Sequence, residues 1–98
     1  MFTELESNVV QWGHEKGILA KADAKAQALK TASEVGEMCD NISKGNDCRD
    51  DIGDIVVTLI LQCHIQGTTL TECLQLAYDE IKGRTGKMVD GVFVKDAV

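Results

Sequence analysis

Hydrophobic and polar residues follow the period of an α-helix along most of this chain. Between residues 23 and 44 the apolar positions recur at alternating intervals of four and three, which predicts a single apolar stripe on an amphipathic helix. The stripe consists of Ala28, Ala32, Val35, Cys39 and Ile42. The same reasoning predicts three further helices, over residues 3–16, 47–66 and 70–82.

Polar residues and glycines mark the ends of these helices. A short polar side chain at each start can accept hydrogen bonds from the first free amide groups. The expected caps are Thr3 in a capping box with Glu6, Asp23, either Asn46 or Asp47, and Thr69 in a capping box with Glu72. A glycine follows each helix, where a left-handed backbone ends it: Gly17, Gly45, Gly67 and Gly83.

The short connections predict that consecutive helices pack antiparallel. The expected fold class is therefore all-α: a four-helix, mostly antiparallel bundle. An irregular C-terminal tail follows it, with a short extended piece at residues 92–94. The 98 residues make one domain, 1–98, and the absence of proline fits a helical chain.

Residues 55–61 are apolar on nearly every side of the predicted third helix. This marks a central helix and exceeds what one small four-helix domain needs to bury. Because a domain of this size has a modest core, association of copies is a common remedy. We therefore predict a homo-oligomer, either a dimer or a dimer of dimers.

Charge and composition narrow the possible partners and compartment. The net charge of −6 argues against nucleic acid as the main partner. The beginning of the chain lacks the basic start and apolar stretch of a signal peptide, and residues 55–61 are too short to span a bilayer. The four cysteines form no CxxC pair, so buried free thiols are expected rather than a zinc site. Together these features predict a cytoplasmic protein.

Two pairs of acids carry the candidate chemistry: Glu34 with Glu37, and Asp51 with Asp54. Residues three apart share one face of a helix, so two adjacent helices would gather all four carboxylates. Such a cluster repels itself unless a cation or protons neutralise it. Oxygen donors alone suit a hard divalent cation, Mg²⁺ or its substitute Mn²⁺. The alternative is a solvated helix face in which Lys30 and Glu34 form an ordinary ion pair.

A di-iron centre of the kind found in four-helix bundles would need Glu-x-x-His motifs. Neither His14 nor His64 has a glutamate three residues before it. We expect His64, near the end of an apolar helix, to be a capping or packing residue.

At these acids the chain resembles the MazG-like, all-α nucleoside triphosphate pyrophosphohydrolases. That family has a Glu-x-x-Glu pair on one helix and a Glu/Asp-x-x-Asp pair on the next. The resemblance extends over residues 12–96 and includes the segments QALKTASEVGEMCDNISKGN, RDDIGDIVVTLILQCHIQG and YDEIKGRTGKMVDGVFVKD. Asp51 is a departure, since the family usually has the longer Glu there. The shorter side chain would bind the metal through water or draw the helices closer.

The resemblance implies Mg²⁺-dependent hydrolysis of nucleoside triphosphates, with deoxynucleoside triphosphates as the favoured substrates, to a nucleoside monophosphate and pyrophosphate. It implies a role in clearing nucleotide pools. Glu34, Glu37, Asp51 and Asp54 would hold the metal, and either Glu34 or Glu37 would act as the catalytic base. The alternative function is a non-catalytic helical interaction or regulatory module that keeps the fold.

Cationic and aromatic side chains complete the predicted site. Positive groups should hold the phosphates, and the candidates are Lys30, Arg84, Lys87 and Lys95. The three in the tail could instead be a solvated basic segment. Trp12, the one indole, could stack on the nucleobase or pack helix one onto the core.

Overall fold

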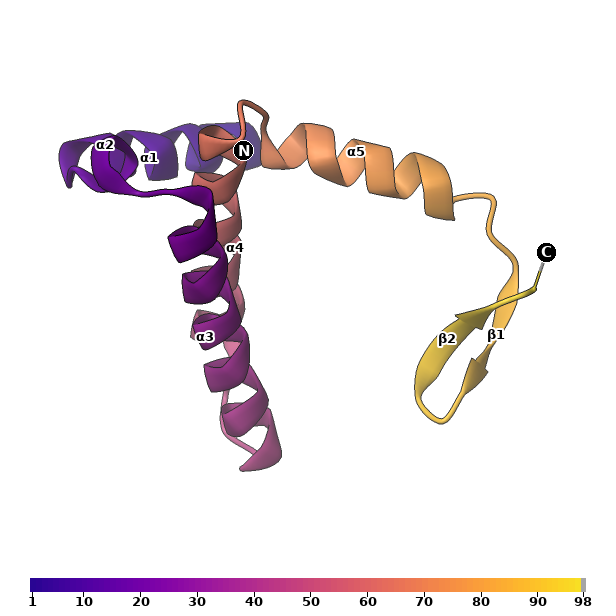
Figure 1. Cartoon of the computed structure of the whole chain (residues 1–98). Helices are drawn as coiled ribbons and strands as arrows, with labels where there is room; N and C mark the ends of the chain where they lie inside the picture. Colours follow the sequence, from indigo (N-terminus) through magenta and orange to yellow (C-terminus); the bar gives the residue numbers. More distant parts are fainter. Residues whose placement is uncertain (98) are drawn as a thin grey trace.

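The computed structural model of the chain describes residues 1–97, which form five α-helices and a β-hairpin (Figure 1). The elements are α1 (Phe2–Glu15), α2 (Ile18–Lys21), α3 (Ala24–Ser43), α4 (Arg49–Ile65), α5 (Leu70–Ile81), β1 (Gly86–Val89) and β2 (Val92–Lys95). The mostly helical class predicted from the sequence is confirmed. The short helix α2, in the connection between α1 and α3, was not predicted.

Two of the predicted caps are confirmed. An Asp23 carboxylate oxygen accepts a hydrogen bond from the amide of Ala26 at 2.8 Å and starts α3. The hydroxyl of Thr69 accepts from the amide of Glu72 at 3.1 Å and starts α5. The second bond of that capping box, from the Thr69 amide to the Glu72 carboxylate, is absent. The Glu72 carboxylate accepts a hydrogen bond from the hydroxyl of Thr68 instead. Both caps are local, which is why the sequence reveals them.

The two remaining caps differ from the prediction. Helix α1 begins one residue earlier, at Phe2, and Thr3 does not cap it. Its supposed partner Glu6 is buried, and its Oε1 accepts a hydrogen bond from the Leu70 amide at 2.7 Å. A tertiary contact has therefore replaced the local one. Helix α4 has Cys48 as its N-cap with no side-chain cap bond, although Asp47 accepts from the Arg49 amide at 3.0 Å.

Helices α3 and α4 run side by side in opposite directions (Figure 1). Three polar contacts set their register. The Gln62 amide donates to the carbonyl of Ala24 at 2.9 Å, near the start of α3. The Thr31 and Thr58 hydroxyls are 2.9 Å apart in the middle. At the other end the Asn41 side chain on α3 donates to Asp51 on α4 at 2.8 Å.

The face that α3 turns toward α4 is its polar face. Gln27 and Glu34 are buried there, and the Gln27 amide donates to the Thr58 carbonyl at 3.1 Å. The predicted apolar stripe of α3 points outward instead. Val35 is 38% exposed and Ile42 is 55% exposed. An apolar stripe that its own chain leaves uncovered is unfavourable in water, because its burial would be worth about 25 cal/mol per Å².

The single chain does not close the predicted four-helix bundle. Helix α1 crosses the C-terminal end of α4, while α5 leads away from it and carries the hairpin apart from the α3–α4 pair (Figure 1). The crossing of α1 is close, since a side chain at Gly13 would meet Leu61 at 2.7 Å. The core is correspondingly small, with Ile60, Leu61 and Cys63 as its buried apolar residues. Within residues 1–97, no helix is both long enough and apolar enough to cross a membrane.

The tail was predicted as irregular and instead forms an antiparallel hairpin, in which the extended piece predicted at residues 92–94 lies within β2. Lys87 pairs with Val94 and Val89 pairs with Val92. The turn is made by Asp90 and Gly91, which both have positive φ, at 48° and 83°. That conformation matches the right-handed twist of paired strands, and Asp-Gly is a favoured sequence for it.

Candidate acidic metal site between α3 and α4

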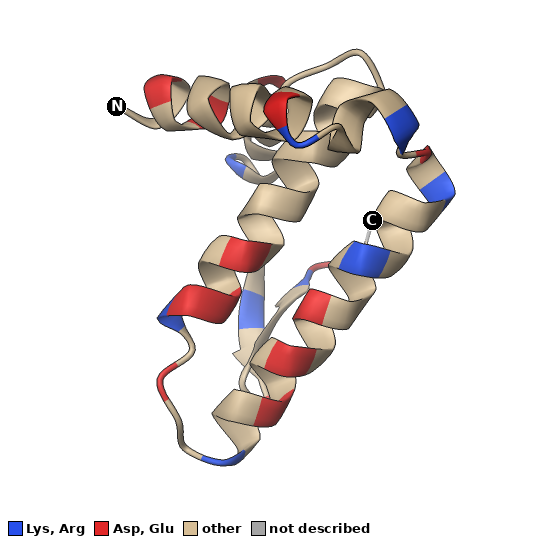
Figure 2. Ribbon diagram, turned by 90° about the vertical axis from the view of Figure 1, so that its left-hand side faces the viewer, with Lys and Arg blue, Asp and Glu red and all other residues tan. Residues whose placement is uncertain are grey.

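The register of α3 and α4 brings the two acid pairs together. Glu34 and Glu37 lie between Thr31 and Asn41 on α3, two of the residues that contact α4. The charge of Glu34 influences Asp54 on α4, and the charge of Asp51 on α4 influences Glu37. Acidic residues occupy both helices of the pair (Figure 2). The arrangement of the helices puts the two acid pairs on neighbouring helices, and their gathering into one metal site stays a prediction.

Glu34 is the most constrained member of the group. Its Oε1 is 3.0 Å from the Nζ of Lys30, one turn earlier on α3. The hydrogen bond from Lys30 lowers the pKa of Glu34 and raises the pKa of Lys30. The other carboxylate oxygen, Oε2, is buried and accepts no hydrogen bond from a standing donor within residues 1–97, although a proton shared with Glu37 would lower the pKa of Glu34 and raise that of Glu37. A buried oxygen of an ionised group without a partner is costly, so it is suited to a ligand.

The pKa values of Glu37 and Asp54 are raised, whereas that of Glu34 is lowered. The negative charge of Glu34 is the main cause that raises the pKa of Glu37. Loss of hydration is the main cause that raises the pKa of Asp54, and the charges of Asp50, Glu34 and Asp51 add to it. The acids therefore interact electrostatically across the two helices. Removing a proton from the group becomes harder as its members ionise.

Asp51 is buried and fixed by a residue that the sequence analysis did not assign to the site. Its Oδ2 accepts a hydrogen bond from Asn41, whose own side-chain oxygen accepts one from Asn46 at 3.2 Å. Asn41 lies one turn beyond Glu37 on the same polar face, and that spacing is the only sequence signal for it. The bond occupies one Asp51 oxygen and orients the carboxylate across the helix pair.

The acids are neighbours rather than a preformed set of ligands. Within residues 1–97, no three His, Cys, Asp or Glu side chains lie in positions to hold a metal ion together. Glu34 is turned to Lys30. The residues nevertheless fit a hard divalent cation, because their donors are oxygens, one buried oxygen lacks a partner, and the acids repel one another. Binding would require Glu34 to share its carboxylate between Lys30 and the ion.

The structure does not bring the cations of the tail to these acids. Arg84 and Lys95 line a hollow where α5 meets the hairpin, and Lys87 lies on β1. The hairpin stands apart from α3 and α4 (Figure 1). Among residues 1–97, Lys30 is the only cation that influences the pKa of Glu34, Glu37 or Asp54. Within one chain, the predicted phosphate-binding residues therefore do not all lie near the acids.

Trp12, on α1, also lies away from the acids, at a distance measured along the axis of α4. It is 43% exposed on α1, and α1 packs against α4 at Leu61, roughly two helical turns beyond Asp54. More than half of the surface of Trp12 is covered, so the alternative that Trp12 packs α1 onto the core also stays open. A role in stacking on a base stays a prediction.

No protein-family model, curated protein or solved structure matches this chain. The resemblance to the MazG-like family therefore rests on the acid pairs and the segments around them, and it stays a prediction.

Proposed function

We propose that this protein is a Mg²⁺-dependent hydrolase that converts nucleoside triphosphates, with a preference for deoxynucleotides, into a monophosphate and pyrophosphate. The observation that supports the proposal is the electrostatic influence that Glu34, Glu37, Asp51 and Asp54 have on one another across α3 and α4, together with the buried Oε2 of Glu34. A triphosphate carries about four negative charges at neutral pH, so such a site can accept it only after cations neutralise both partners.

The side chains have separate tasks in this proposal. Glu34, Glu37, Asp51 and Asp54 would hold Mg²⁺, and Asn41 would keep Asp51 in place. The ion would supply charge neutralisation of the phosphates and a more acidic water. Glu37 is the better candidate for the base, because the charge of Glu34 raises the pKa of Glu37 and makes it more basic. Lys30 instead holds Glu34 in its ionised form.

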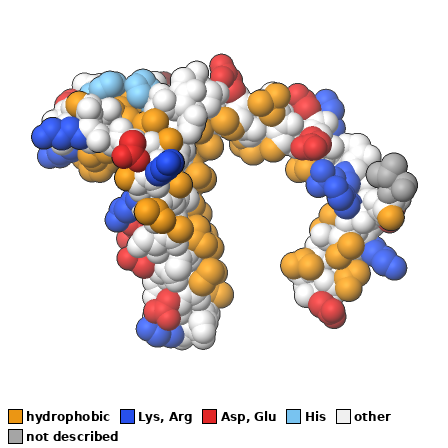
Figure 3. All heavy atoms as spheres, viewed as in Figure 1, with side chains coloured by type: hydrophobic (Ala, Val, Ile, Leu, Met, Phe, Trp, Pro, Cys, Tyr) orange, Lys and Arg blue, Asp and Glu red, His pale blue; other side chains and the backbone are white. Residues whose placement is uncertain are grey.

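A second copy of the chain would complete the site. The chain leaves much apolar surface open on α3 and on α5 and the hairpin, where hydrophobic side chains gather (Figure 3). On α5, Leu74 is 64% exposed and Tyr78 is 55% exposed, and Phe93 on β2 is 53% exposed. Association through these faces would bury them. It would also place the hairpin of one copy beside the acids of the other.

The proposal assigns Lys87 and Lys95 to the phosphates held by the other subunit. Substituting either lysine by alanine should weaken turnover of a deoxynucleoside triphosphate, and more at low salt, where charges are least screened. Lys25, exposed at the start of α3 and outside the acid group, is the matched control. Equal and negligible effects at all three positions would leave the tail without a role in catalysis.

Mixing inactive variants tests whether the site crosses between subunits. Glu37→Gln and Lys87→Ala damage different halves of one shared site. When they are mixed and allowed to exchange subunits, each mixed dimer regains one intact site, so roughly a quarter of wild-type activity should return. No recovery despite proven exchange would mean that each chain builds its site alone. Absence of pyrophosphate release from all common triphosphates would instead favour a non-catalytic interaction module.

A further inference from the structure

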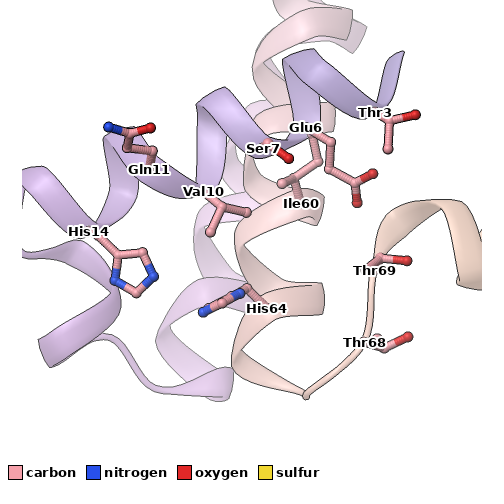
Figure 4. Close-up of a pocket in the computed structure, with 10 residues that line it drawn as sticks. All are labelled: Thr3, Glu6, Ser7, Val10, Gln11, His14, Ile60, His64, Thr68 and Thr69. Carbon is pink, nitrogen blue, oxygen red and sulfur yellow. The ribbon is translucent and has the colours of Figure 1, made fainter. Parts of the chain in front are cut away.

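A second cluster of chemically active side chains lies at the junction of α1 and α4. His14, in the last turn of α1, faces His64, in the last turn of α4. Their ring centroids are 5.1 Å apart and the ring planes are nearly perpendicular, at 88°. The nitrogen-bearing sides of the two rings point toward each other beside a pocket (Figure 4). These are the only two histidines of the chain.

This pair is separate from the acidic site. His64 follows Asp54 by ten residues on α4, which corresponds to about 15 Å along the helix. The sequence analysis expected His64 to cap or pack. His64 packs edge-on against His14, and both histidines are exposed, so solvent and dissolved ions can reach their rings.

The geometry suits one ion shared by both imidazoles. With metal–nitrogen bonds of about 2 Å and tetrahedral angles, two imidazoles on one ion place their ring centroids about 5 Å apart. The observed separation is 5.1 Å. Imidazole is a ligand for Zn²⁺, Cu²⁺, Ni²⁺ and Co²⁺, whereas Mg²⁺ prefers oxygen. The two sites therefore differ in the class of metal that they favour.

The surroundings leave room for the rest of a coordination shell. The pocket beside the rings has a volume of about 360 Å³ and is lined by polar groups that include Ser7, Gln11 and Thr68. Within the described part of the chain, no third histidine, cysteine or carboxylate joins the pair in a metal-binding group. Water or a small ligand in the pocket would fill the other positions, as at metal sites that exchange ligands.

We propose that His14 and His64 form a binding site for a divalent transition metal ion such as Zn²⁺, with positions open to the pocket. The ion ties the end of α1 to the end of α4, which are joined otherwise by the packing around Gly13 and Leu61. Because the two imidazoles are brought together only in the folded chain, binding stabilises the fold.

The test is a Zn²⁺ titration by calorimetry together with thermal melting at a fixed protein concentration. Wild-type protein should bind Zn²⁺ and melt at a higher temperature in its presence. His14→Gln and His64→Gln should each lose at least tenfold in affinity and most of the gain in melting temperature. Their exposed positions make loss of the fold unexpected, and helical circular dichroism before titration checks it.

Three control variants separate this site from other zinc ligands. Gln11→Ala changes the same pocket without touching an imidazole, Glu37→Gln removes an acid of the other site, and Cys63→Ala removes the thiol next to His64. All three should keep the histidine-dependent binding. Unchanged affinity in either histidine variant would overturn the proposal. So would loss of binding only in Glu37→Gln or Cys63→Ala, which would assign the zinc to carboxylates or to the thiol.

Discussion

The acidic site predicts that Glu37→Gln changes stability in opposite ways with and without Mg²⁺. Without the ion, the carboxylate of Glu37 lies in the field of Glu34, which raises the pKa of Glu37. A carboxyl group with a raised pKa in the folded state favours unfolding once it is ionised. Removing that charge should therefore stabilise the ion-free protein at pH 7.

The pH dependence of this effect has a definite sign. The penalty from Glu37 is absent below its unfolded pKa of about 4.5 and develops as the pH rises through the higher folded value. The melting temperature of Glu37→Gln should therefore exceed that of wild type at pH 7. The difference should narrow as the pH falls toward 4.5.

Addition of Mg²⁺ should reverse the order. An ion that binds only the folded state adds about 2.7 kcal/mol at a hundred times its dissociation constant. For a chain of 98 residues, 1 kcal/mol corresponds to about 4–8 °C in melting temperature. Wild type should then gain roughly 10–20 °C at such an excess, while Glu37→Gln gains little.

The assay is differential scanning calorimetry over a series of Mg²⁺ concentrations at constant protein concentration and ionic strength. Glu4→Gln is the matched control, because Glu4 is exposed on α1 and outside the acidic group. It should respond to Mg²⁺ as wild type does. If wild type and Glu37→Gln respond equally, or neither responds to Mg²⁺ or Mn²⁺, the interpretation of the acids as a metal site is wrong.

Two further predictions concern the open apolar face and the thiols. Val35→Lys places a charge in the outward stripe of α3 and should shift light scattering from an oligomer toward the 10.6 kDa monomer; a monomeric wild type would contradict the proposed assembly. Iodoacetamide should label Cys39, which is exposed, well before Cys63 at pH 7.5, because burial raises the pKa of Cys63 to about 11 and the thiolate is the reactive form. Equal labelling rates by mass spectrometry would show that the end of α4 opens readily.

The grouping of the acids could be predicted from the sequence because it depends on two simple rules. Spacing by three places Glu34 with Glu37 and Asp51 with Asp54 on single helix faces, and a short connection makes their helices antiparallel. Asn41 was missed because an amide on a polar face has many possible roles. Only its contact with Asp51 selects one of them.

Which face of α3 meets α4 could not be predicted from the helix alone. The apolar stripe that includes Val35 and Ile42 is the expected inner face of an amphipathic helix. Within one chain, α4 instead meets the face of Gln27 and Glu34, where polar contacts cross between the helices. The preference is set by the residues of α4 that face it, such as Thr58, which the pattern of α3 alone does not contain, and the stripe is left for another surface.

The extended piece at 92–94 was predicted, but its pairing into a hairpin was missed because both strands are short and exposed, so helical and strand periods are both weak there. The Asp90-Gly91 pair was a usable hairpin signal that the sequence analysis passed over. The contact between Glu6 and Leu70 had no local signal at all, since it joins residues from opposite ends of the helical region.

The most direct test of the proposed function is the position at which a triphosphate is cut. Purified protein with Mg²⁺ and a deoxynucleoside triphosphate should be followed by phosphorus NMR from the first minutes. Attack at the α phosphorus yields monophosphate and pyrophosphate together, with no diphosphate intermediate, and Asp54→Asn should abolish both products. Early diphosphate and orthophosphate, or turnover that persists in Asp54→Asn, would contradict the account.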